Sequence, residues 1–128
     1  MYHRHLIEAV QAHLQARGAK AVTYYGDMTR VEKDRSHLEF TTGDADVMVA
    51  SIKTIGVNWS CAAYSLFGEH SHVPAEVEQA GKRLLRDGQT KPVLEQHILI
   101  EDSYDQHLLA TLYAKQDDVS LLYAQTKL

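Results

Sequence analysis

Apolar and polar residues follow two different periods along the chain, and these periods predict an alternation of helices and strands. The helical period covers residues 5–18, 29–40, 74–86 and 103–128. Gly18 is placed to end the first helix as a C-cap. Thr29 and Glu32 have the spacing of a capping box, which predicts where the second helix begins. The last helix is either one piece or is divided around Asp117.

Runs of β-branched and aromatic residues lie between these helices and predict short strands. The runs cover residues 21–26, 47–50, 62–68 and 93–100, and the second and third are apolar enough to predict buried strands. Strands separated by helices need crossover connections, so we expect an α/β domain with a mostly parallel sheet covered on both faces. Ligands of such sheets bind at the carboxyl ends of the strands. We therefore expect a ligand site at the loops after Ala50 and Phe67 or at the turn at Gly88.

Composition limits the class of protein. The chain has 128 residues, of which 45% are hydrophobic and 23% charged, as is usual for one globular domain. The net charge of -4 argues against indiscriminate coating of nucleic acid but permits a local basic patch. The single cysteine, Cys61, excludes an internal disulfide and is typical of a reducing compartment. Because no apolar run is long enough to span a membrane and the amino-terminal residues lack the form of a signal peptide, we expect a cytoplasmic protein with no membrane partner.

Gln79, Arg83 and Arg86 are spaced so that a continuous helix would place them on one face. The planar fork of an arginine suits two-point contact with a phosphate, so two arginines on one face could hold a polyphosphate. The alternative is a solvated basic helix end, favoured by the helix dipole. Composition by itself favours this alternative.

The loop after Ala50 offers hydroxyls, a lysine and backbone amides in Ser51, Lys53, Thr54, Gly56 and Asn58. Such groups suit the phosphate oxygens of a nucleotide or of a nucleic-acid backbone, although an ordinary loop uses the same residue types.

Histidines are numerous, and two pairs, His3 with His5 and His70 with His72, could in principle bind a metal. No H-E-x-x-H spacing supports this, so we expect no metal site. The sequence also has no G-x-x-x-x-G-K-[ST] loop, no G-x-G-x-x-G and no G-x-S-x-G. The first of these absences argues against a P-loop hydrolase acting alone.

Taken in order, several segments resemble the C-terminal RecA-like lobe of superfamily II helicases, in particular of Swi/Snf-type DNA translocases and their phage relatives. The most specific match is to the form P-x-x-x-x-Q-A-x-x-R-x-x-R-x-G-Q-x-x-x-V, carried by Pro74, Gln79, Ala80, Arg83, Arg86, Gly88, Gln89 and Val93. A strand ending in serine followed by a G-hydrophobic-N loop is matched by Ser51, Gly56, Val57 and Asn58. Weaker matches are Gly26, Arg35 and Phe40, and the stretch Ser103 to Asp105, which is similar to the family's T-h-E.

The resemblance implies that residues 1–128 form one three-layer RecA-like lobe, with residues 103–128 as its helical extension. In the family this lobe faces a P-loop lobe, and ATP with Mg²⁺ binds between the two. The resemblance therefore implies that Arg86 is an arginine finger and that Arg83 also contacts the phosphates. It further implies nucleotide-side roles for Gln79, Gly56 and Asn58, and DNA-backbone contacts for Ser51, Lys53 and Thr54.

The sequence departs from the family in three respects. The P-loop lobe is absent, the strand that precedes the first helix in the family has no counterpart, and the family's "WNP" is replaced by "HVP". The last change puts detailed DNA contacts in doubt. A parallel sheet without one strand exposes its edges, so we expect a homo-oligomer or packing against another part of a parent protein.

Three functions remain open at this stage. The first is half of an ATP-dependent DNA translocase or helicase, inactive alone and completed by a P-loop lobe in cis or in trans. The second is a non-catalytic DNA-binding or helicase-modulating module derived from such a lobe. The third is a small nucleotide-binding or metal-dependent enzyme that uses the histidines.

Overall fold

Helices and short parallel strands alternate in the computed structural model, which describes residues 3–54 and 57–126. The elements of this described part are α1 (Arg4–Ala16), β1 (Ala21–Tyr24), α2 (Arg30–Thr41), β2 (Val47–Ala50), β3 (Tyr64–Phe67), α3 (Pro74–Gly81), β4 (Leu94–His97) and α4 (Tyr104–Thr126). The expected α/β class is confirmed. The backbone of α4 is one continuous helix, not two pieces.

Local sequence signals explain where the first two helices end and begin. Gly18 has φ of 88°, a left-handed conformation that stops α1 at low cost for a glycine. At the start of α2 the Thr29 hydroxyl accepts the Glu32 N–H, and the Glu32 carboxylate accepts the Thr29 N–H at 2.8 Å. The predicted capping box is therefore confirmed.

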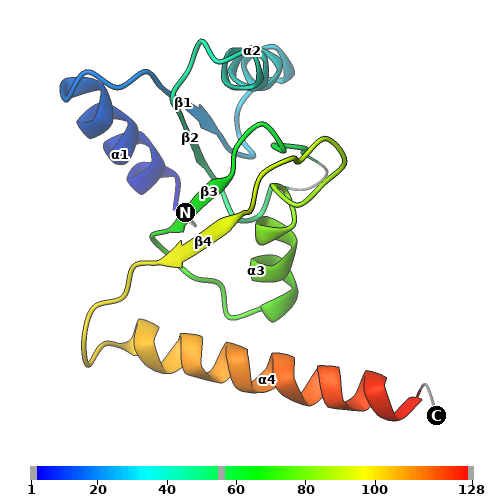
Figure 1. The fold of residues 1–128 in the computed structure, drawn as a ribbon. Helices are drawn as coiled ribbons and strands as arrows, with labels where there is room; N and C mark the ends of the chain where they lie inside the picture. The colour runs from blue at the N-terminus through cyan, green and yellow to red at the C-terminus, as the bar shows by residue number, and fades with distance from the viewer. Residues whose placement is uncertain (1–2, 55–56, 127–128) are drawn as a thin grey trace.

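The strands form two parallel pairs, whereas the sequence predicted one sheet. β1 pairs with β2, with Ala21 opposite Val47, and β3 pairs with β4, with Tyr64 opposite Leu94. Within the described residues, no hydrogen-bonded ladder joins β2 to β3. Figure 1 shows α1 on one side of the strands and α2 and α3 on the other, so the three-layer arrangement is present.

The main hydrophobic core lies where β3, α3 and α4 meet. Its buried members are Ile52, Phe67, Val77, Ala80, Leu108 and Leu112. Because Ile52 comes from the loop after β2, the core fixes that loop against α3. This packing places the loop after β2 beside the end of α3, and the candidate site is formed by that loop and the segment that follows α3.

Two expectations about these elements are wrong. α3 ends at Gly81, so it does not reach Arg86. After Gly81 the backbone changes to bonds between residues three apart, from Arg83 N–H to the Ala80 carbonyl and from Leu84 N–H to the Gly81 carbonyl, at 3.3 Å each. The strand β3 is not fully buried, because Tyr64 and Leu66 are 53% and 51% exposed.

Candidate functional site

The side chain of Arg83 ties the segment after α3 to the loop after β2. Its Nη1 donates to the Ser51 carbonyl at 3.0 Å, and its Nη2 donates to the Ile52 carbonyl at 2.5 Å and to the Thr54 carbonyl. The residue is 4% exposed. Three carbonyl dipoles thus replace water around the buried guanidinium, and the loop is held in one conformation.

An aromatic ring completes this anchor. The Arg83 guanidinium carbon lies 5.4 Å from the ring centroid of Trp59, within the range of a cation–π interaction. The backbones of these two residues are also bonded, because the Trp59 N–H donates to the Arg83 carbonyl at 2.9 Å. That bond joins the segment after α3 to the residues that follow the loop after β2.

The electrostatics of Arg83 agree with its burial. Burial first, and then the nearby positive charge of Arg86, lower the pKa of Arg83 to about 10. The guanidinium stays protonated at neutral pH. Its charge is therefore retained inside the domain, at a cost that the three carbonyls offset.

A glutamine and a glycine shape the turn that follows. The Gln89 side chain donates to the carbonyls of Ala62 and Leu84 at 2.6 and 3.0 Å, which joins this turn to the segment before β3. Gly88 has φ of 99°, and a Cβ there would lie 3.2 Å from the Ser60 hydroxyl. Both residues therefore contribute to the shape of the turn.

Arg86 lies in this turn and is exposed, in contrast to Arg83. Gln79 is exposed on α3. The predicted single face of Gln79, Arg83 and Arg86 does not exist, because α3 ends before both arginines. The interpretation of a solvated basic helix end is wrong for Arg83 for the same reason and because its side chain is buried.

The predicted residues of the loop after β2 differ in whether their side chains bond within the protein or are exposed to solvent. The Ser51 carbonyl accepts from Arg83, and its hydroxyl accepts the Lys53 N–H at 3.3 Å, so it shapes the loop. Thr54 donates its hydroxyl to the Ser51 carbonyl at 2.8 Å. The side chain of Lys53 is exposed and can meet an anion. Asn58 is also exposed, and its amide donates to the Asp87 carbonyl at 3.5 Å, while Gly56 lies outside the described residues.

Sequence reasoning missed two features. Trp59 is 5% exposed and supports Arg83, and its only sequence signal is an aromatic residue directly after the G-hydrophobic-N loop. The second is a hydrogen-bonded pair, His70 Nε2 to His97 Nδ1 at 2.8 Å, in which His97 also contacts Glu95 at 3.0 Å. Among the residues the structure describes, no group of three or more His, Cys, Asp or Glu could hold a metal ion.

Comparison with known structures identifies the fold as that of the C-terminal RecA-like domain of helicases. The C-terminal part of the Fun30 ATPase domain, a Swi/Snf-type protein, matches with a TM-score of 0.79 and 22% identity, over 84% of this chain and 36% of that one. The C-terminal domain of S. cerevisiae Dbp5 matches with a TM-score of 0.74 and 16% identity, over 92% of this chain and 67% of that one.

Sequence comparison points to the same group of proteins. The helicase-like transcription factor CHR28 of Arabidopsis thaliana is 29% identical over 103 residues, which is 78% of this chain and 10% of that protein. No family model matches. The resemblance to a helicase C-terminal lobe is thus supported by structure and by sequence. The chain corresponds to a small part of the length of that relative, which also carries other regions.

Within the described part of the chain, no helix is long and apolar enough to cross a membrane.

Proposed function

We propose that this chain supplies the arginine-finger side of an ATP site in a DNA helicase or translocase and is inactive without a P-loop lobe. The observation that supports this most directly is that two arginines close together after α3 differ in exposure. Arg83 is buried on three carbonyls, whereas Arg86 is exposed and carried by the turn that Arg83 anchors.

In this proposal Arg86 contacts the phosphates, and its fixed charge stabilises the negative charge that develops on the transferring phosphoryl group. Arg83 positions the turn and the loop after β2 relative to each other. A direct phosphate contact by Arg83 stays a prediction, and it would require the guanidinium to leave carbonyls that it now satisfies. Gln79 and Asn58 are both exposed, as contacts with a nucleotide would require.

ATP with Mg²⁺ would be shared with the partner lobe. The described residues of this chain offer the phosphates a guanidinium but no cluster of metal ligands, so the donors to Mg²⁺ would come from that lobe. Lys53 is exposed within the loop that Arg83 holds, so we propose its side chain as a contact for a DNA phosphate. Ser51 and Thr54 would act through the loop conformation. We place the protein in the cytoplasm, consistent with its single exposed cysteine.

The test is DNA-stimulated ATP hydrolysis by the purified chain, alone and mixed with a separately expressed P-loop lobe of a Swi/Snf-type ATPase. We expect no hydrolysis by the chain alone and measurable hydrolysis by the mixture. Arg86→Ala should lower kcat of the mixture by on the order of 10³-fold, as for other arginine fingers. Lys91→Ala removes an exposed charge from the same segment and serves as the matched control.

Two results would argue for other functions. Equal kcat for the Arg86→Ala and unmodified mixtures would exclude Arg86 as the finger. DNA binding by the chain alone that weakens steeply with salt, and persists in Arg86→Ala while the mixture shows no hydrolysis, would favour the non-catalytic DNA-binding module.

A further inference from the structure

Two histidines and a glutamate form a chain of hydrogen bonds at the β3–β4 pair, outside the candidate site. His70, in the loop after β3, contacts His97 of β4, with 2.8 Å between His70 Nε2 and His97 Nδ1. The other ring nitrogen of His97, Nε2, lies 3.0 Å from the Glu95 carboxylate. His70 is 9% exposed, and the side chain of His97 is 10% exposed. The two imidazoles are therefore almost fully removed from water.

The carboxylate determines where the protons of this chain lie. An ionised Glu95 can only accept, so His97 Nε2 carries a proton and donates it. In the neutral His97 ring Nδ1 is then an acceptor, and His70 Nε2 is the donor to it. His70 Nδ1 is left as an acceptor, and this buried atom has no hydrogen-bond partner among the described residues. A proton added there would create a buried N–H without an acceptor.

Aromatic rings enclose both imidazoles. The Phe67 ring, a member of the main core, stacks on His97 with 4.8 Å between ring centroids and on His70 with 6.5 Å. Tyr113 of α4 contacts His97 edge-on, with 6.5 Å between centroids. Apolar surroundings of this kind favour the neutral form of an imidazole.

Charged and titratable groups reach His70 from β4 and from α4. Glu95 and His97 belong to β4, and Asp105 and Tyr113 belong to α4. Burial first, and then electrostatic interaction with His97, lower the pKa of His70. Asp105 raises this pKa and the amino-terminal charge of the chain lowers it, both with smaller effects. Proton uptake by His70 is therefore coupled to a conformation in which its ring reaches water.

The loop that carries His70 is held at both ends. The Glu69 carboxylate accepts the N–H of His3, the N-cap of α1, at 2.9 Å. The Ser71 hydroxyl, on a residue that is 3% exposed, donates to the Glu76 carboxylate in the first turn of α3. These bonds join the loop to α1 and α3, so the loop is not free to carry His70 outward.

The first turns of α4 are held less firmly than this loop. In the connection from β4, Ile100 is 69% exposed, and Tyr104 at the first position of α4 is 68% exposed. Asp102 between them has φ of 55°, a left-handed conformation that is unfavourable for a residue with a side chain. Figure 1 shows α4 extending past α3 toward its carboxyl end. α4 is therefore the element that can move away from the histidine pair.

We propose that the His70–His97 pair is a pH-sensitive latch, which holds the first turns of α4 against the β3–β4 pair while His70 is neutral and releases them when His70 takes up a proton. Because the pKa of His70 is lowered in the latched state, the released state binds the proton more readily, and release is favoured as pH falls below 6.5. Release also removes packing from the loop after β2, because Leu108 and Leu112 of α4 share a core with Ile52.

Amide exchange of the 128-residue chain, followed by NMR at pH 7.5 and 5.5, measures release. After correction for the intrinsic effect of pH, the amides of residues 108–113 should exchange up to about tenfold faster at pH 5.5, which is the limit for uptake of one proton by a group of ordinary pKa 6.5. The amides of α2 should not change, which separates release from unfolding of the whole domain. Equal changes in α2 and α4, or no change in α4, would overturn the proposal.

Two histidine variants show which group takes up the proton. His70→Gln removes the titrating ring but keeps an N–H donor near the position of Nε2, so residues 108–113 should stay protected at pH 5.5. His107→Gln is the matched control, because His107 is exposed on α4, and this variant should keep the pH dependence. A pH dependence that persists in His70→Gln would show that other groups cause it.

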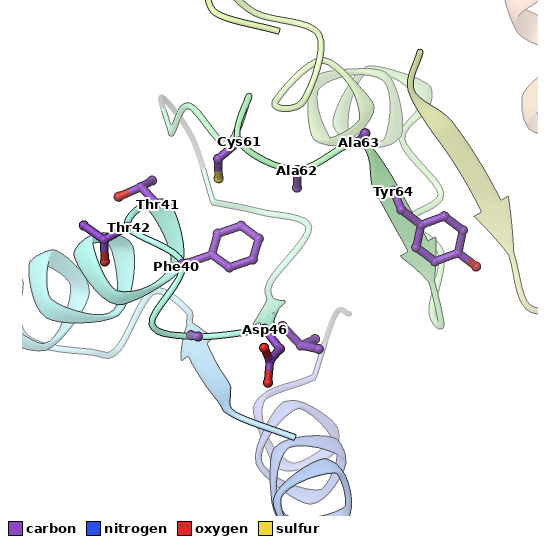
Figure 2. A pocket seen from close by; sticks show the side chains of 11 residues that line it. Phe40, Thr41, Thr42, Asp46, Cys61, Ala62, Ala63 and Tyr64 are labelled. Atoms are coloured by element: carbon purple, nitrogen blue, oxygen red, sulfur yellow. The ribbon is translucent and has the colours of Figure 1, made fainter. Parts of the chain in front are cut away.

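A chain that retains His70 provides a second measurement if His70→Gln does not fold. Leu112 is 3% exposed, so a thiol introduced by Leu112→Cys reacts with a pyridyl disulfide only after release. Cys61 is exposed and serves as the internal reference; Figure 2 shows it beside a hollow of about 480 Å³ that Phe40 of α2 also lines.

Lower pH reduces the thiolate fraction at both sites alike, so the ratio of the two rates reports release alone. The rate at Leu112→Cys relative to that of Cys61 should rise up to about tenfold from pH 7.5 to 5.5. A constant ratio would contradict the latch. These readouts need neither ATP nor DNA, so their outcome is separate from that of the proposed function.

Discussion

The buried anchor formed by Arg83 leads to a quantitative prediction about stability. Arg83→Met keeps the length and the apolar stem of the side chain but removes the charge and the donors. Two of its acceptors belong to the buried residues Ser51 and Ile52. Each buried acceptor left without a partner costs ~1–3 kcal/mol, and loss of the contact with Trp59 costs ~1 kcal/mol.

An opposing effect reduces this cost. Burial and the charge of Arg86 lower the pKa of Arg83 to about 10, and this shift is equivalent to ~3 kcal/mol against the charged form. Removing the charge recovers that amount. The balance predicts that Arg83→Met lowers the free energy of unfolding by on the order of 2 kcal/mol, because the unpaired carbonyls and the lost ring contact outweigh the recovered desolvation cost.

Urea unfolding followed by fluorescence measures this change, since Trp59 is the only tryptophan and contacts Arg83. A loss of that size moves the urea midpoint down by roughly 1 M for a small domain. Arg30→Met is the control, because the Arg30 side chain is 94% exposed. If Arg83→Met were as stable as the unmodified chain, desolvation of the guanidinium would cancel its hydrogen bonds, and the description of Arg83 as a net stabilising anchor would be refuted.

Two further predictions concern pH and the turn. Burial first, and then electrostatic interaction with His97, lower the pKa of His70 below its ordinary value of 6.5, and Asp105 opposes this shift. Because the unfolded chain then binds a proton more readily than the folded one, the stability contributed by neutral His70 is present above pH 6.5 and is lost as pH falls below that value. The Tm should therefore decrease between pH 7.5 and 5.5, and His70→Gln should reduce that decrease; an unchanged slope would show that other groups cause it. Gly88→Ala should lower the free energy of unfolding by ~1 kcal/mol or more, because Gly88 has φ of 99° and little room beside Ser60. Gly26→Ala, where no atom lies within 4 Å of the new Cβ, should have little effect in the same melting assay, and equal effects of the two changes would contradict the role of the turn.

Local interactions explain which parts of the fold were predictable. The start of α2 depends on Thr29 and Glu32, which are close in sequence and form the same bonds in the structure. The end of α1 depends on Gly18, whose conformation any glycine adopts at low cost. The end of α3 was predicted too late, and the segment after it is held by a bond between residues far apart in sequence, from Trp59 N–H to the Arg83 carbonyl.

In the candidate site, too, some features depend on residues close in sequence and others on residues far apart. The sequence by itself determined the order of helices and strands and the P-x-x-x-x-Q-A-x-x-R-x-x-R-x-G-Q pattern, because period, capping and spacing are local properties. Only the tertiary structure decided that Arg83 is buried on the loop after β2 while Arg86 is exposed. It likewise decided that no ladder of hydrogen bonds joins β2 to β3 within the described residues. Burial and strand pairing depend on which distant segments meet, and a pattern along one chain does not contain that information.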